Sequence, residues 1–191
     1  MTITFRKFAA SARLSQETTA YDTQVLFDKK LIGVCSNDGR GGMGHFWPES
    51  GAEPDLVSRA EAWANQQPVL DWDGTPMARG GQTMYHQGIA DYCDTLAAKT
   101  LADKQLRSSL QRLLKTHVLF TCEDTKGPGV FQIKRPWTKE LEPHFRNKYP
   151  EAVVLNELPF GTAMEVFERQ TRLAQDPSAG QAPPKAKSPS P

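Results

Sequence analysis

Hydrophobic and polar residues alternate with the period of a β-strand in the first part of the chain. Between residues 18 and 36 the alternation is interrupted at 28–30, which predicts a hairpin of two strands. Residues 1–8 alternate in the same way, so we expect a third strand in one antiparallel sheet. Gly33, within the second hairpin strand, predicts a bulge or a close approach of another backbone. The residues expected to be buried in this sheet are Phe27, Ile32 or Val34.

In the middle of the chain the apolar spacing changes to that of helices. Pro54 suits a first helical position, and the apolar residues after it recur at helical spacing until Pro68. A second stripe runs from about Thr83 to Lys99 and on to Lys115, with basic residues on its polar side. Because Thr100 is a possible N-cap, this stripe fits either two helices or one long kinked helix.

The last third of the chain predicts a compact unit of hairpin, helix and strand. Residues 117–134 have the pattern of strand, turn and strand, and a short helix over 139–148 is expected to be capped by Thr138. Residues 151–156 are typical of a strand, and 164–173 have room for one or two turns of helix.

These elements together predict an α+β fold with an N-terminal antiparallel sheet, central helices and the C-terminal unit. The 191 residues are enough for one domain, which we place over residues 1–175. Residues 176–191 contain five prolines and no aliphatic side chain larger than alanine. They cannot bury enough surface to offset the entropy of ordering, so a disordered Pro-rich tail is expected.

Charge and cysteine usage narrow the functional classes. Lys and Arg total 23 against 22 Asp and Glu, so any contact with nucleic acid must come from a local patch. Cys35, Cys93 and Cys122 are widely spaced, which favours reduced, buried thiols in a cytoplasmic protein. No apolar run is long enough to cross a bilayer, so a membrane partner is not expected.

The stretch 36–48 is the strongest candidate for a functional site, because it places several glycines beside an arginine and a histidine. Glycine amides can converge on an anion, and Arg40 can bind phosphate or carboxylate through two hydrogen bonds. The stretch matches no phosphate-loop motif, and a structural turn that needs positive φ angles is the competing interpretation. The expected ligand-binding residues are Asn37, Asp38, Gly39, Arg40, Gly41, Gly42 and His45.

Catalysis in the same loop is the first alternative. His45 with Asp38 or Cys35 would supply the groups of a small hydrolase or transferase. The four histidines lie far apart and show no metal-ligand spacing, so neither a metal nor a cofactor is expected.

Two further surfaces are candidates. Basic residues alternate with aromatic ones over residues 131–149, which is typical either of a nucleic-acid-binding face or of a small aromatic core inside a ring of solvated cations. The aromatic residues Phe46, Trp47 and Trp72 would suit a module that docks on another protein.

The segment Phe27 to Gly42, which reads FDKKLIGVCSNDGRGG, resembles the N-terminal hairpin and loop of small uncharacterised phage and plasmid proteins. The segment Lys148 to Glu157 is similar to their C-terminal strand. The resemblance implies a mobile-element origin, and host machinery, nucleic acid or a nucleotide as the partner. It assigns no role to any residue.

The sequence therefore predicts a small phage or plasmid binding protein rather than an enzyme. Its ligand is expected to be anionic, a nucleotide or a nucleic-acid backbone, held at the loop around Arg40. The alternatives are the hydrolase or transferase and a protein-interaction module that acts on host proteins.

Overall fold

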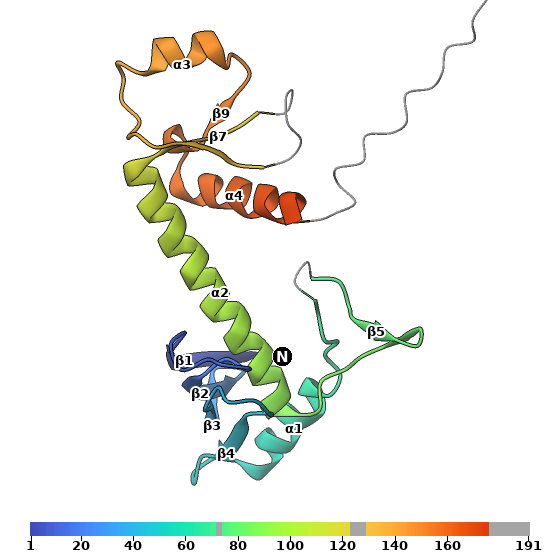
Figure 1. Ribbon diagram of the computed structural model, residues 1–191. Helices are drawn as coiled ribbons and strands as arrows, with labels where there is room; N and C mark the ends of the chain where they lie inside the picture. The colour runs from blue at the N-terminus through green and yellow to red at the C-terminus, as the bar shows by residue number, and fades with distance from the viewer. Residues whose placement is uncertain (72–73, 123–128, 176–191) are drawn as a thin grey trace, which may run out of the picture. The chain divides into compact units, whose positions relative to one another are not determined.

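A computed structural model describes residues 1–71, 74–122 and 129–175 of the chain. Its contacts divide the chain into two compact units, residues 1–104 and residues 105–191 (Figure 1). Helices and antiparallel sheets occur in the chain together, which confirms the α+β class. The predicted disordered tail, 176–191, lies outside the described residues.

Unit 1 is built on a four-stranded antiparallel sheet in the order β1-β2-β3-β4. The strands are β1 (Ile3–Ala10), β2 (Tyr21–Phe27), β3 (Lys30–Asn37) and β4 (His45–Pro48). The predicted hairpin and the N-terminal strand are therefore confirmed as neighbours. Strand β4 is a correction, because residues 45–48 were expected to belong to the loop.

The predicted close approach at Gly33 is confirmed. A Cβ atom at this position would overlap the carbonyl oxygen of Trp47 and lie 2.7 Å from the Phe46 ring. The pairing of β2 with β3 also shifts register just beyond Val25, which is paired with Gly33. Only glycine lets β4 lie this close to β3.

One face of the sheet is buried against two helices, α1 (Pro54–Ala64) and α2 (Ile89–Thr116). Phe27 and Ile32 are fully buried in this core, as expected, whereas Val34 is half-buried on the other face. The largest fully buried helix residue here is Ile89. Pro54 stands in the first turn of α1, as its sequence position predicts.

Helix α2 is one continuous helix, so the prediction of one long helix rather than two is confirmed, while the expected kink stays a prediction. The Thr100 hydroxyl donates to the Leu96 carbonyl within the helix at 2.7 Å, so the expected N-cap role of Thr100 is wrong. The helix also begins six residues after Thr83, because Gln82–Thr83 forms strand β6. This strand pairs with β5 (Ala78–Arg79) in a short hairpin.

Unit 2 contains the predicted hairpin, helix and strand. Strands β7 (Val118–Thr121), β8 (Phe131–Ile133) and β9 (Val153–Val154) form an antiparallel sheet in the order β8-β7-β9. One set of core residues joins β7 to α2 and to α4 (Phe160–Gln175). A second set joins the same sheet to α3 (Glu142–Lys148).

Several boundaries in unit 2 differ from the predictions. Leu141 precedes the first turn of α3, so Thr138 is not its cap. Strand β9 is only two residues long because the chain turns into a 3-10 helix, η1 (Leu155–Glu157). There the Asn156 side chain accepts a hydrogen bond from the Leu119 amide at 2.8 Å. Helix α4 is longer than the one or two turns expected, since it begins at Phe160.

Each unit has its own core. Residues 1–175 behave as a single domain only if these cores unfold together, so the single domain expected from the sequence stays a prediction. Among the described residues, no helix combines the length and the apolar character that a membrane span needs.

Candidate functional site

The glycine loop, residues 38–44, connects β3 to β4 and has the backbone of a tight irregular turn. Gly39, Gly41 and Gly42 have φ angles of 82°, 105° and 85°. Residues other than glycine rarely adopt such angles, so these glycines are required by the shape of the loop.

Asn37, at the end of β3, holds this loop through both ends of its side-chain amide. Its Oδ1 accepts hydrogen bonds from the Gly39 amide and from the Thr18 hydroxyl, each at 2.9 Å. Its Nδ2 donates to the Gly42 carbonyl at 3.3 Å and to the Asp94 carboxylate at 3.1 Å. Asn37 is only 7% exposed, so it acts as an internal brace of the loop and is not presented to a ligand.

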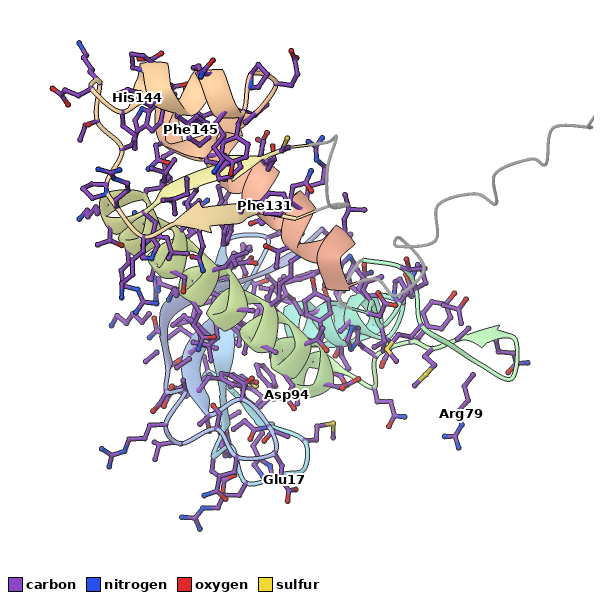
Figure 2. All side chains as sticks on the ribbon, turned by 45° about the horizontal axis from the view of Figure 1, so that its top comes forward. Glu17, Arg79, Asp94, Phe131, His144 and Phe145 are labelled. Carbon is purple, nitrogen blue, oxygen red and sulfur yellow. The ribbon has the colours of Figure 1, made fainter. Side chains whose placement is uncertain are left out.

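Asp94 is the second brace, and it comes from α2. Figure 2 shows it on this helix, where Oδ2 accepts from the Gly44 amide at 2.7 Å and Oδ1 accepts from the Tyr21 hydroxyl at 2.9 Å. The Tyr21 oxygen also lies 3.2 Å from Sγ of Cys35. One carboxylate therefore ties the loop, β2 and α2 together. Sequence reasoning missed this residue because it stands fifty positions after Gly44.

The backbone amides that were expected to hold an anion are largely used inside the protein. The internal donors are the amides of Gly39, Arg40, Gly41 and Gly44, which bind side-chain oxygens of Asn37, Asp38, Thr18 and Asp94 respectively. An amide that already donates to a protein oxygen has no hydrogen left for a phosphate. The loop geometry therefore agrees better with the structural-turn interpretation.

Charge around the loop also opposes anion binding. A Cβ atom added to Gly41 would lie 2.5 Å from the Glu17 carboxylate, so this acid packs directly on the loop. Two more carboxylates belong to this region, that of exposed Asp38 and that of Asp94, which binds Asn37. The loop has a single arginine, Arg40, to balance these acids. The loop presents to solvent the side chains of Asp38, Arg40 and Met43, of which Met43 is 54% exposed.

The sheet separates His45 from Cys35, one of the two partners expected for it in catalysis. His45 is paired with Ser36 and Cys35 with Phe46 across β3 and β4. Directly paired residues share a face and neighbours along a strand alternate, so His45 and Cys35 lie on opposite faces. Cys35 is fully buried, where a hydrogen bond with Cys93 lowers its pKa. A thiol on the core side of the sheet is not accessible to a substrate.

The basic and aromatic residues of 131–149 separate into a core and a surface. Phe145, which is 4% exposed, packs edge-on against Phe120 with ring centroids 5.0 Å apart, and Trp137 packs on Phe145 at 5.4 Å. Figure 2 labels Phe131 and Phe145, both members of this aromatic core. The exposed basic residues around it are Lys134, Arg135, Lys139, His144 and Lys148. Phe145 is thus a core residue, and the other rings of this stretch, Phe131, Trp137 and Tyr149, are half-buried against the core.

Charge is unequally divided between the two units. Residues 1–104 contain ten Lys and Arg against thirteen Asp and Glu, a net charge of −3. Residues 105–191 contain thirteen against nine, a net charge of +4. The positive net charge therefore belongs to unit 2, and unit 1, which contains the glycine loop, is net negative.

The clearest basic surface is the outward face of α2 within unit 2. Arg107, Arg112 and Lys115 are exposed, and the sequence contains no acidic residue between Asp103 and Glu123. In the described part of the chain, no ion pair links these three side chains to a carboxylate. At about 100° per residue, Arg112 and Lys115 lie on the side of the helix away from the leucines that pack in the core, whereas Arg107 lies at the border of that side, about 20° from Leu114.

Comparison with family models, with curated proteins and with solved structures finds no match for this chain. The described residues also contain no group of three or more His, Cys, Asp or Glu side chains that could hold a metal ion. The function must therefore be argued from the surfaces themselves.

Proposed function

We propose that the protein is a nucleic-acid-binding protein whose unit 2 contacts the phosphate backbone. The contact surface is the basic face of α2, defined by Arg107, Arg112 and Lys115. The observation that carries this proposal is the separation of charge: residues 105–191 have a net charge of +4, and α2 carries exposed cations that form no ion pair within the described part of the chain.

The spacing of these cations suits a row of phosphates. Arg107 and Lys115 are eight residues apart, which is about 12 Å along the helix at about 1.5 Å per residue. Duplex DNA presents one phosphate charge per about 1.7 Å of axis, so three cations over this length find partners without a special fit. The two arginines can also bind a phosphate through two parallel hydrogen bonds.

A membrane surface is a poorer partner for the same face. Basic amphipathic helices bind membranes by inserting their apolar side between the lipids. In α2 that side is occupied, because Leu110 is fully buried and packs with Leu119 and Leu155 in the core of unit 2. Only the charged side is left for a partner, which favours a hydrated polyanion such as nucleic acid.

This proposal keeps the anionic partner inferred from the sequence but moves the contact from Arg40 to α2. It does not require catalysis, since no catalytic group stands on this face. The resemblance of residues 27–42 to phage and plasmid proteins suggests the same kind of partner.

The test compares two triple variants with equal loss of charge. The first is Arg107→Gln, Arg112→Gln, Lys115→Gln. The control removes three exposed cations of unit 1 by Arg13→Gln, Lys29→Gln, Arg40→Gln. Fluorescence anisotropy with a labelled DNA duplex of about 20 base pairs, repeated over a salt series, gives the affinity and its salt dependence.

We expect the α2 variant to lower the slope of log K against log salt by about 2.7, the value for three lost phosphate contacts, while the control keeps the wild-type slope. Equal losses in both variants would mean that only net charge matters, and would contradict the α2 site. A loss confined to the control would place the site in unit 1 instead, and the single variant Arg40→Gln would then show whether the glycine loop carries it.

A further inference from the structure

The C-terminal end of α2 meets the sheet of unit 2 at a junction that is held by one side chain. The amide nitrogen of Asn156 donates to the carbonyl oxygens of Leu114, at 3.0 Å, and His117, at 2.9 Å. Its oxygen accepts a hydrogen bond from the Leu119 amide at 2.8 Å. These three bonds tie the last turn of α2 to the first residues of β7, so the backbones of the two elements keep a fixed spacing.

A second pair of exposed cations comes beside this junction. Ile133, the last residue of β8, is paired with Val118, the first residue of β7. Because the two strands are antiparallel, the next residue along the chain, Lys134, comes beside His117, where α2 has just ended. Arg135 follows directly, and both side chains are exposed. In both views β8 runs toward this end of α2 (Figures 1 and 2).

The cations on either side of the junction come from stretches without carboxylates. The three cations of α2 belong to residues 104–122, and Lys134 and Arg135 to residues 129–139; neither stretch contains an Asp or a Glu. In the described part of the chain, none of the five forms an ion pair. We call these five residues the junction surface: Arg107, Arg112, Lys115, Lys134 and Arg135.

The carboxylates of the neighbouring elements leave this surface positive. Glu157, which follows β9 on the other side of β7, is paired with Arg146. Glu165 and Glu168 stand on α4, which packs against the leucines of α2. The first acid after the cations of β8 is Glu140, near the start of α3. The junction surface therefore gathers five positive charges that no neighbouring element cancels.

Unit 2 presents no exposed aromatic ring beside these cations. All of its Phe, Tyr and Trp residues lie in the described part of the chain, and each belongs to one of its two cores. None is among the exposed large hydrophobic residues. Proteins that bind single strands combine cations with exposed rings on which the bases stack. A surface with cations alone suits a duplex, whose bases are already stacked on each other.

We infer that the partner of unit 2 is a nucleic-acid duplex, and that the contact extends beyond α2 to Lys134 and Arg135. This inference rests on the proposed function, because it names the form of the nucleic acid and the remaining contacts of the same site. A duplex is stiff, so it binds best to cations whose positions are set in advance, as the bonds of Asn156 set them here. Its phosphates lie along two strands, so cations on the helix and beside its end find partners together.

The test adds one double variant of the full chain, and its matched control, to the α2 triple variant. The double variant is Lys134→Gln, Arg135→Gln. The control is Lys148→Gln, Arg169→Gln, which removes one exposed lysine from α3 and one exposed arginine from α4. Circular dichroism verifies that both fold. Each is titrated with the labelled DNA duplex, and with one of its strands alone, over the same salt series.

With the duplex, we expect the double variant to lower the slope of log K against log salt by about 1.8, the value for two lost phosphate contacts. The control should keep the wild-type slope. The wild type should also bind the duplex more tightly than the single strand at each salt concentration.

Three results would overturn the inference and leave the proposed function standing. An unchanged slope in the double variant, together with a lowered slope in the α2 triple variant, would confine the contact to the helix. Equal losses in the double variant and its control would mean that these positions contribute only net charge. A single strand bound as tightly as the duplex would exclude a duplex as the preferred partner. Failure of the proposed function looks different, because the α2 triple variant itself would then keep the wild-type slope.

Discussion

Replacement of Asp94 by alanine should destabilise unit 1 far more than its position on a half-exposed helix turn suggests. The change removes the acceptor of three hydrogen bonds, from the Gly44 amide at 2.7 Å, the Tyr21 hydroxyl at 2.9 Å and Asn37 Nδ2 at 3.1 Å. Hydrogen bonds to a charged group contribute about 1.5 to 3 kcal/mol each. Because Asn37 keeps its bond to Gly42 and water can enter the partly exposed site, we expect a net loss of about 2 to 3 kcal/mol.

Urea unfolding followed by circular dichroism measures this loss, and Asp38→Ala is the matched control. Asp38 is an exposed carboxylate of the same loop that accepts a hydrogen bond from the Arg40 amide at 3.1 Å, so its removal should cost about 0.5 kcal/mol. Hydrogen exchange of the Gly44 amide should also accelerate in Asp94→Ala. If both variants unfold at the same urea concentration, the carboxylate does not brace the loop and our account of the network is wrong.

Three further outcomes are expected. Gly33→Ala should lower the free energy of unfolding by about 1 to 3 kcal/mol by pushing β4 away, whereas Gly51→Ala, with open space around it, should be nearly neutral in the same urea assay. Burial raises the pKa of Tyr21 above its ordinary value of 10.0. Stability should therefore fall above about pH 10, where the unfolded chain ionises first, and Tyr21→Phe should flatten this part of a urea pH profile. If residues 1–175 are one domain, fluorescence from Trp63 in unit 1 and Trp137 in unit 2, each kept as the sole tryptophan, should report the same urea transition.

The strands with strong alternation were predictable, and the weak ones were not. Residues 21–27 alternate over a whole strand with one face fully buried, so the period of two is plain in the sequence. Strand β4 has four residues and ends in Pro48, too short for a period to appear. The start of α2 was misplaced because residues 83–88 continue a helical stripe in the sequence, while their backbone belongs to the β5–β6 hairpin and to the turn that follows it.

The candidate site shows a different limit. A sequence shows which donors a loop contains but not which acceptors meet them, so the amides from Gly39 to Gly44 seemed available for an anion. Their actual acceptors include Asp94, on a helix far along the chain. The uneven charge of the two units was hidden for a related reason, since their boundary at Lys104 falls inside a continuous helix with no change in composition to mark it.

The bond between the glycine loop and α2 also has an evolutionary consequence. Asn37 and Asp94 form a hydrogen bond with each other, and each also accepts one from an amide of the loop. A substitution at either position therefore leaves the other residue without its hydrogen-bond partner. The two residues should therefore covary among relatives.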